Sequence, residues 1–423
     1  MTNAVPVIDL DLAPPRPRAA SEGPRPMVVP ALLAAVLLGV SAAAPQGTAM
    51  APVLSAGGAA AAAFTLGPSA FYTAALGRGT DGEPGVTRYD LPGGDRAWAT
   101  ALPQNVRSLT LDPDSGVLLA RPGNGPRMTF LDAADGTILW HLESAATSAV
   151  ALTGARVLLR SELSDTNTRL TLSDARTGMR VWTRIVDTRA EIANDLSEHP
   201  DRIVLVGLDG RVLTLRFADG SVLGDGRLGV PLSSDPAQPR YATAAVAGER
   251  LYLSRREREG TSLTAYGLPG LTVRWTAKDV PVGDVHDCGP VLCVAHGHGL
   301  SGLDPGNGSV LWTQPAWTSA GVTPDGVLVA YEGANNPESV VIDPRTGAAV
   351  ERLGHVLTVE GVRLRTDTGR GRTWVSVTDP ADGRAHTVGS LDAAVPYGCE
   401  VRAPYLACPT VPGPTGVWRL PQP

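Results

Sequence analysis

A short pattern recurs along most of the chain and constrains its fold more than any other feature. It contains an apolar run that ends near an Asp, three further residues, a Gly, and a second apolar run that often carries a Trp. Clear copies occupy residues 89–98, 131–140, 173–182 and 303–312, weaker copies occupy 342–351 and 378–387, and degenerate copies occupy 216–224 and 266–275. The glycines follow one another at intervals of 36 to 50 residues, so the chain is a tandem repeat of one structural unit.

Each copy predicts a tight turn between two strands. The Asp carboxylate can accept hydrogen bonds from the turn amides, and the Gly can adopt the left-handed conformation that closes a hairpin. The Trp offers a large apolar surface for packing against the next unit. The predicted turn residues are Asp90 and Gly94, Asp132 and Gly136, Asp174 and Gly178, Asp304 and Gly308, Asp343 and Gly347, and Asp379 and Gly383. The predicted blade-packing residues are Trp98, Trp140, Trp182, Trp275 and Trp312.

The length of the unit predicts the architecture. About 40 residues with three or four short strands is the size of one β-propeller blade, and a single blade cannot bury both faces of its sheet. We therefore expect an all-β propeller of about eight four-stranded blades, with seven or nine also compatible. Residues 399–420 read as a further incomplete unit, which could complete the ring with N-terminal strands.

The turn motif, as in Asp174–Gly178–Trp182, resembles the repeat of the pyrroloquinoline-quinone-like (PQQ-like) β-propeller family from about Phe64 to Pro423. This resemblance implies eight blades. The family includes quinoprotein alcohol dehydrogenases, a periplasmic outer-membrane assembly lipoprotein, and exported propellers without assigned activity. Its enzymes add a disulfide between adjacent cysteines, calcium ligands and a catalytic Asp, whereas this sequence has no adjacent Cys pair. We therefore expect no catalytic residue, no cofactor and no metal ligand.

The N-terminal part predicts a membrane segment. Residues 1–26 are rich in Pro and contain Arg16, Arg18 and Arg25, whereas residues 27–44 carry no charge. As a helix these 18 residues would extend about 27 Å, close to the roughly 30 Å of a hydrocarbon core. We expect a cytoplasmic tail (1–26), one transmembrane helix or signal-anchor (27–44), an Ala/Gly-rich linker (45–67) and an extracytoplasmic propeller (68–423). The alternative is a cleaved signal peptide, which would give a secreted protein.

Four cysteines form two local pairs, Cys288 with Cys293 and Cys399 with Cys408. An even number of cysteines in an exported chain favours disulfides. Three histidines, His286, His296 and His298, surround the first pair. Because thiolates and imidazoles in such spacing can bind zinc, a zinc site is the alternative for that pair.

The remaining features limit the function classes. The net charge of −6 excludes a strongly basic nucleic-acid binder, and 43% hydrophobic residues exclude a fully disordered chain. Two Gly-x-Gly-x-x-Gly matches, at 77–82 and 297–302, precede strands and are predicted to be hairpin glycines. The charged run 255–259 is expected to be a solvated hairpin tip or a partner contact, and Trp317 and Trp374 are expected to pack within blades.

Together these features predict a membrane-tethered extracytoplasmic propeller that acts as a binding or scaffold module without catalysis. Propeller faces present several loops on a rigid disc, so the expected partner is a protein or a cell-envelope glycan. The alternative is a propeller that binds a small molecule or a quinone, such as a degenerate PQQ-dependent dehydrogenase.

Overall fold

The computed structural model describes residues 49–423 except 57–62, 75–84, 124, 165–166, 194–200, 233–240, 259, 282, 324–325, 334–337, 368–369, 380–383, 393, 412 and 422–423. The expected cytoplasmic tail (1–26) and membrane helix (27–44) lie outside the described residues, as do Gly383 and residues 77–82. Within the described ranges, no helix is both long and apolar enough to cross a bilayer.

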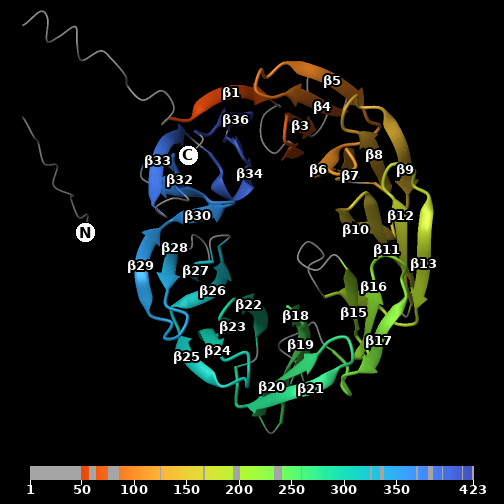
Figure 1. The fold of residues 1–423 in the computed structure, drawn as a ribbon, viewed down its shortest axis with the longest axis vertical. Coiled ribbons are helices and arrows are strands. Elements are labelled where there is room, and N and C mark those ends of the chain that lie inside the picture. Colours follow the sequence, from red (N-terminus) through yellow and green to blue (C-terminus); the bar gives the residue numbers. More distant parts are fainter. Residues whose placement is uncertain are drawn as a thin grey trace, which may run out of the picture. The chain divides into compact units, whose positions relative to one another are not determined.

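The described residues form nine four-stranded antiparallel sheets, which follow one another around a ring (Figure 1). We number these blades 1 to 9. Blade 1 contains β2 (Ala63–Leu66), β3 (Ala70–Ala74), β4 (Gly85–Asp90) and β5 (Arg96–Ala101). Blade 2 contains β6 (Val106–Asp112), β7 (Val117–Pro122), β8 (Arg127–Asp132) and β9 (Ile138–Glu143). Blade 3 contains β10 (Thr147–Thr153), β11 (Arg156–Ser164), β12 (Asn167–Asp174) and β13 (Arg180–Val186). Blade 4 contains β14 (Ala190–Ile192), β15 (Arg202–Gly207), β16 (Arg211–Arg216) and β17 (Val222–Arg227).

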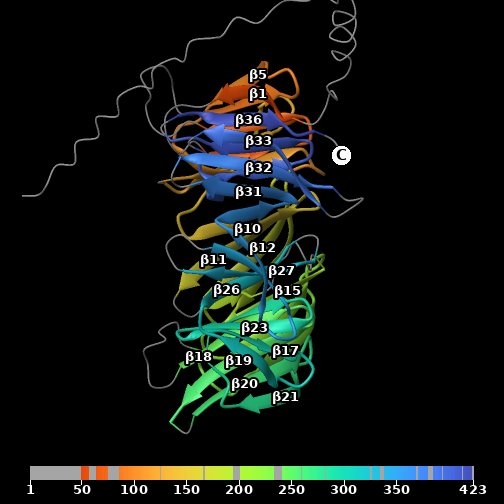
Figure 2. The ribbon, with the colours of Figure 1, turned by 90° about the vertical axis from the view of Figure 1, so that its left-hand side faces the viewer.

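The second half of the ring repeats this plan. Blade 5 contains β18 (Tyr241–Ala247), β19 (Arg250–Glu257), β20 (Gly260–Gly267) and β21 (Thr272–Lys278). Blade 6 contains β22 (Asp284–Cys288), β23 (Val291–His296), β24 (Gly299–Leu303) and β25 (Val310–Gln314). Blade 7 contains β26 (Trp317–Val322), β27 (Leu328–Glu332), β28 (Glu338–Ile342) and β29 (Ala349–Gly354). Blade 8 contains β30 (Val356–Val359), β31 (Val362–Asp367), β32 (Arg372–Thr378) and β33 (Ala385–Asp392). Seen from the side, strands such as β31, β32 and β33 run along the axis of the ring (Figure 2).

Blade 9 is assembled from both ends of the propeller. Its C-terminal strands are β34 (Glu400–Arg402), β35 (Tyr405–Pro409) and β36 (Thr415–Arg419), preceded by the 3₁₀ turn η1 (Pro396–Gly398). Its outermost strand is β1 (Ala51–Ala56), which pairs antiparallel with β36 in the register Ser55↔Gly416. Figure 1 shows the red β1 beside the blue β36. The prediction that the C-terminal unit completes the ring with an N-terminal strand is confirmed.

Two sequence predictions need correction. The expected number of eight blades is too low, because the repeat motif is the turn between the third and fourth strands of a blade. In blade 9 these two strands come from opposite ends of the chain, so no such turn exists there. The expected linker 45–67 is also wrong in part, since it contains β1 and β2; the propeller therefore begins before residue 68.

The repeat turns share one backbone geometry. In the turn of blade 2, the Gly136 amide donates to the Asp132 carbonyl at 2.9 Å, and the Asp132 carboxylate accepts from the Ala134 amide at 2.8 Å. The same bond from glycine amide to aspartate carbonyl closes the turns at Asp90, Asp174, Asp304 and Asp343. Gly136 has a positive φ of 75°, which suits glycine because it has no Cβ. For Asp379, the structure shows a bond from its amide to the Arg384 carbonyl at 2.9 Å.

The five repeat tryptophans each join their own blade to the next one. Each indole N–H donates to a backbone carbonyl in the repeat turn of the following blade, over 2.8 to 3.3 Å. The pairs are Trp98 with Ala133, Trp140 with Ala175, Trp182 with Phe217, Trp275 with Pro305, and Trp312 with Pro344. The turn glycine lies under the ring, because a Cβ added to Gly136 would come within 2.6 Å of the Trp98 ring.

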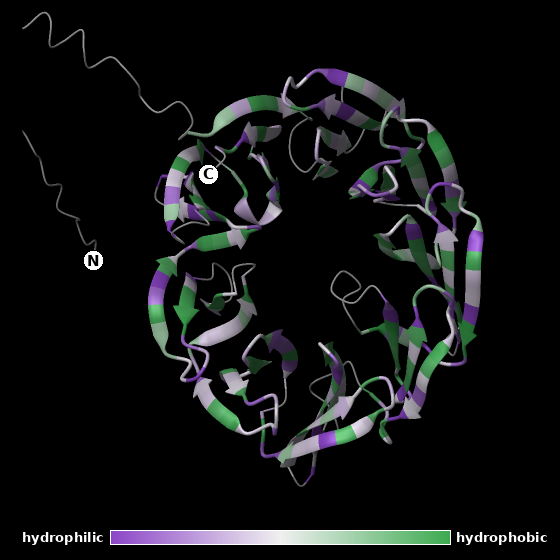
Figure 3. Cartoon of the chain, in the orientation of Figure 1, coloured by the Kyte–Doolittle hydropathy of each residue, from purple (hydrophilic) through white to green (hydrophobic). Residues whose placement is uncertain are grey.

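The hydrophobic core lies between blades rather than within one central layer. Side chains from both faces of most sheets pack against the neighbouring sheets, so most inner strands are apolar on both sides. The outermost strands alternate between hydrophobic and hydrophilic residues (Figure 3), since one side of each faces solvent. Some residues on the exposed side are nevertheless apolar: on β13, Val181 is 45% and Ile185 is 56% exposed.

Candidate functional site

The cysteines are placed as the sequence predicted. Cys288 and Cys293 form one disulfide, and Cys399 and Cys408 form the other, with S–S distances of 2.05 and 2.10 Å. The first bond joins β22 to β23. Because both of its sulfur atoms are bonded to each other, this pair is not available for the zinc alternative.

The nearby histidines make local contacts instead. His296 Nε2 lies 3.0 Å from Ser301 Oγ, and the rings of His296 and His298 are 6.5 Å apart. Burial lowers the pKa of His296, and the neighbouring His298 lowers it further. In the part of the chain that the structure describes, no group of three or more His, Cys, Asp and Glu side chains is placed to hold a metal ion.

The interface between blades 7 and 8 differs from the other interfaces of the ring. Eight apolar clusters of buried side chains join blade 1 to 2, 2 to 3, 3 to 4, 4 to 5, 5 to 6, 6 to 7, 8 to 9, and 9 to 1. Among the described residues, no such cluster joins blade 7 to blade 8. We call this interface the seam.

The second strand of blade 8 explains the seam. In six other blades, this strand turns two apolar residues toward the preceding blade. They are Leu118 and Ala120, Val157 and Leu159, Ile203 and Leu205, Leu251 and Leu253, Leu292 and Val294, and Leu328 and Ala330. In blade 8, Val362 and Leu364 belong to the cluster with blade 9. Because side chains alternate along a strand, Arg363 and Arg365 face blade 7.

The repeat tryptophan is also missing at the seam. The position four residues after the turn glycine is Glu351 in blade 7, and Glu351 is exposed. Blade 8 also lacks this Trp and has Thr387 there, but its interface with blade 9 keeps an apolar cluster. Blade 4 lacks it too and has Gly224 there, but its interface with blade 5 keeps an apolar cluster. At that interface the buried Arg202 side chain donates to the Gly248 carbonyl at 2.9 Å and pairs with Glu249. Among the described residues, the seam therefore lacks both the indole hydrogen bond and an apolar cluster of the kind found at the other interfaces.

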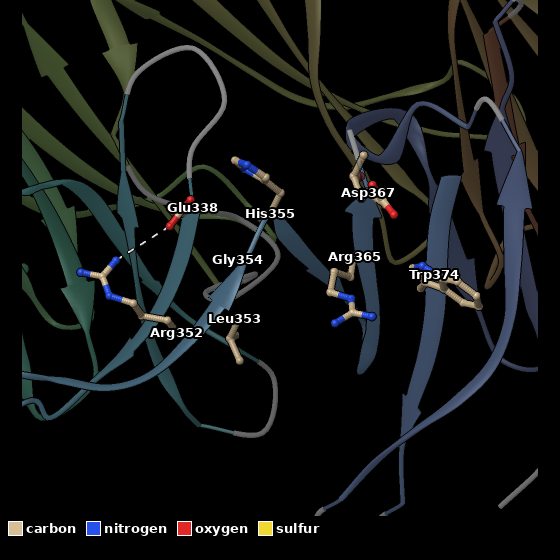
Figure 4. Close-up of a pocket in the computed structure, with 9 residues that line it drawn as sticks. Glu338, Arg352, Leu353, Gly354, His355, Arg365, Asp367 and Trp374 are labelled. Carbon is tan, nitrogen blue, oxygen red and sulfur yellow. Dashed lines mark ion pairs between the residues drawn. The ribbon is translucent and has the colours of Figure 1, made fainter. Parts of the chain in front are cut away.

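A cleft of about 550 Å³ occupies the seam. Figure 4 shows its lining side chains, which come from the two facing blades. The lining residues are Glu338, Arg352, Leu353, Gly354, His355, Arg365, Thr366, Asp367 and Trp374. This volume lies within the roughly 300–1,000 Å³ of typical small-molecule sites, and the lining combines charged groups with one large aromatic ring.

On the blade 7 side, the charges are paired. Arg352 lies 2.6 Å from a Glu332 carboxylate oxygen and 3.8 Å from one of Glu338. The hydrogen bond to Glu332 raises the pKa of Arg352. The guanidinium carbon also lies 5.9 Å from the centre of the Trp317 ring, so Arg352 is held in place from several directions.

On the blade 8 side, the cation that lines the cleft is Arg365. Arg365 and Trp374 are directly opposite each other on β31 and β32. No hydrogen bond or ion pair joins Arg365 to another described residue, and its side chain projects into the space between the two blades (Figure 4). Asp367 lies 3.9 Å from Arg370, and Arg372 lies 3.0 Å from Asp392.

Trp374 departs from the sequence expectation. It was expected to pack within a blade, as the buried Trp317 does, with 4% of its surface exposed. Trp374 instead is half-buried and lines the cleft. The guanidinium carbon of Arg372 lies 6.0 Å from the centre of the Trp374 ring. Arg372 itself does not line the cleft.

A second, smaller cleft of about 330 Å³ lies between blades 3 and 4. Turn residues and apolar side chains line it, namely Thr153, Gly154, Arg156, Leu172, Val181, Phe217 and Ala218. Its one charged lining residue, Arg156, lies 2.5 Å from the Asp174 carboxylate. This cleft therefore offers little specific chemistry compared with the seam.

The comparisons with known proteins agree with the fold. Residues 82–259 match the model of a family described as outer membrane protein assembly factor BamB. The matched residues lie within blades 1 to 5, and the match agrees with the ring of repeat turns and docked tryptophans in supporting a β-propeller built of PQQ-like repeats. No curated protein matches the sequence.

Several solved structures resemble the chain at low identity. BamB from Moraxella catarrhalis is 14% identical with a TM-score of 0.44, covering 88% of this chain and 98% of that one. The computationally designed Ika8 protein is 14% identical with a TM-score of 0.46, covering 87% and 99%. Quinohemoprotein alcohol dehydrogenase from Comamonas testosteroni is 12% identical with a TM-score of 0.44, covering 90% and 79%.

Proposed function

We propose that this protein is an extracytoplasmic binding or scaffold module without catalysis, tethered to the membrane by residues 27–44, and that the seam cleft is its binding site. One observation carries the assignment of the site. A ring that seals eight interfaces with apolar clusters leaves the seam open and lines it with charged groups and an indole.

The seam lowers the stability of the fold, which supports a role for it in binding. Burying a Val or Leu side chain contributes about 1.5–3 kcal/mol. Arg363 and Arg365 stand at positions that are apolar in the six blades compared above, so the chain gives up this stabilisation at one interface only. Departures from an otherwise consistent pattern tend to occur at functional sites.

Export and anchoring are supported by two features. Disulfides persist in oxidising compartments outside the cytoplasm, and both cysteine pairs are bonded. The uncharged run 27–44 has the length of a membrane helix. We expect alkaline phosphatase fused after Pro423 of the full chain to be active and to stay in carbonate-washed membranes. An inactive fusion contradicts export, and an active fusion released with a new N-terminus contradicts the anchor.

Binding at the seam is tested by site-specific crosslinking in native membranes. A photoreactive amino acid replaces Thr366, which lines the cleft, in the full-length protein. The control carries it at Arg345, an exposed position in the repeat turn of blade 7. We expect a crosslinked product with the Thr366 variant and none with the control. Equal products from both positions, or none from either, contradict the seam as the binding site.

A further inference from the structure

We infer that the seam cleft binds an acidic saccharide, whose carboxylate pairs with Arg365 while its sugar ring stacks on Trp374. This inference rests on the proposed binding function of the cleft and names the ligand class. It follows from the charge of the cleft, the placement of the two side chains, and the remaining polar groups.

The charge of the cleft selects an anion at one position. Arg352 is neutralised by Glu332 and Glu338, whereas Arg365 has no partner among the described residues. A guanidinium binds a carboxylate through two parallel hydrogen bonds, which gives both strength and geometric specificity. A ligand carboxylate beside Arg365 would complete the pairing of charges across the seam.

The neighbouring indole selects a ring next to that anion. Arg365 and Trp374 are directly opposite each other on antiparallel strands, where Cβ atoms lie about 4.5–5.5 Å apart, so both side chains belong to the same face of blade 8. A ligand that contacts both side chains would combine an acidic group with a ring. The C–H face of a pyranose is apolar and suits an indole, which offers a large flat apolar surface.

The other lining groups distinguish a sugar from an aromatic acid. The carboxylates of Glu338 and Asp367 line the same cleft and are 46% and 38% exposed. Such oxygens accept hydrogen bonds from hydroxyl groups, whereas the face of an aromatic ring offers them no donor. The same two carboxylates repel a densely charged ligand such as a sulfated chain. One carboxylate per hydroxylated ring, as in a uronic acid, fits these groups best.

The test measures binding of a galacturonic acid trimer to the full-length protein in detergent by isothermal titration calorimetry. The neutral galactose trimer serves as the uncharged counterpart. We expect the acidic trimer to bind more tightly than the neutral one, and its affinity to fall as salt is added. Arg365→Gln and Trp374→Ala should each weaken binding by about tenfold or more, the order expected for a lost charge-assisted pair or stacking surface.

Matched controls separate the site from general effects. Arg345→Gln makes the same charge change in the repeat turn of blade 7 and should leave affinity unchanged. Trp374→Phe keeps an aromatic face and should lose less affinity than Trp374→Ala. Each variant is accepted only if its thermal unfolding midpoint matches that of the parent.

The outcomes distinguish this inference from the proposed function. Equal binding of both trimers, no loss with Arg365→Gln, or tight binding of an acidic peptide in place of the saccharide would overturn the saccharide assignment. If no saccharide binds while the Thr366 crosslink still captures a partner, the ligand class is wrong and the binding function stands. If both experiments are negative, both are wrong.

Discussion

Each turn glycine under a docked tryptophan is constrained in two independent ways. Gly178 has a φ of 68°, in the left-handed region that side chains disfavour. An added Cβ would also lie 2.8 Å from the Trp140 ring of the preceding blade. The first constraint belongs to the turn and the second to the contact between blades, so two substitutions can separate them.

We predict that Gly178→Ala lowers the free energy of unfolding by about 2–4 kcal/mol, through backbone strain and overpacking combined. Gly361→Ala is the matched control, because Gly361 has a φ of 79° and nothing lies within 4 Å of its added Cβ. It should cost only the backbone strain of about 1–2 kcal/mol. Equal losses for both variants in chemical denaturation would contradict the contact with Trp140.

A half-buried carboxyl group at the closure of the ring makes stability depend on pH. The Glu400 carboxylate in β34 accepts from the Leu66 amide at the end of β2, over 2.9 Å, and so joins blade 9 to blade 1. Burial raises the pKa of Glu400, although the hydrogen bonds from Leu66 and Thr65 oppose that shift. Because the pKa of Glu400 is raised in the folded state, this group contributes most to the free energy of unfolding below its unfolded pKa. That contribution is lost as the pH rises through the folded pKa.

Glu400→Gln should remove this dependence, since an amide stays neutral and still offers an oxygen to the Leu66 amide. The stability of the variant relative to the parent should therefore be higher at about pH 7 than at about pH 4. Urea denaturation at both values measures the difference. Glu351→Gln, at an exposed position on β29, should show no such change. A constant difference for Glu400→Gln would contradict the effect of burial.

At the scale of elements, β1 is the strand that closes the ring. It supplies the outermost strand of blade 9 and packs on the repeat turn of blade 1, where an added Cβ on Gly94 would lie 3.2 Å from the Leu54 Cβ. Leu54 thus occupies the place that a repeat tryptophan takes in other blades. Without β1, the edge of β36 would be open to pairing with other chains.

We predict that Leu54→Asp destabilises the propeller by about 2–4 kcal/mol, because it places a charge in an apolar contact. Ser55→Asp adds the same charge on the adjacent exposed residue and should change stability by less than about 0.5 kcal/mol. Thermal unfolding with light scattering measures both stability and aggregation. If the two variants behave alike, β1 does not hold the ring closed.

The elements that could be predicted from the sequence are those with local requirements. A turn that needs Asp and Gly at a fixed spacing can be recognised in the sequence. The repeat of this turn therefore located the blades that contain it. Blade 9 has no such turn, and its strands β1 and β36 are far apart in the sequence, so the count of turns did not include it and the sequence identified only its C-terminal part, as an incomplete unit. The disulfides were predictable because each pair is close in sequence.

The seam left a signal in the sequence that became clear only with the fold. Residues 362–367 read Val-Arg-Leu-Arg-Thr-Asp, an alternation, whereas the corresponding strand of blade 4 reads Ile-Val-Leu-Val at 203–206. Alternation marks a strand that is buried on one face only. The sequence does not tell which neighbouring blade the polar face meets, or that Trp374 lies opposite Arg365. Both depend on pairing between strands and came from the structure.

At the scale of the whole propeller, the described residues form eight interfaces with apolar clusters and one seam without such a cluster. Stability in such a repeat architecture is approximately a sum over neighbouring contacts, so the seam is the place where the ring opens most easily. On the facing side, Val329 and Val341 of blade 7 point toward blade 8, because their neighbours Ala330 and Val340 belong to the cluster with blade 6. Apolar partners for an additional cluster are therefore already present.

We predict that Arg363→Val combined with Arg365→Leu stabilises the propeller and abolishes ligand binding at the seam. Packing these side chains against Val329 and Val341 should add about 1–3 kcal/mol to the free energy of unfolding. This is at the low end of the free energy expected from burying two aliphatic side chains. Proteins often hold functional sites at such a cost in stability. Arg345→Leu, on an exposed turn, should give no gain. A double variant that loses stability in denaturant titrations would show that the arginines hold the seam together, whereas a more stable variant that still binds would place the ligand elsewhere.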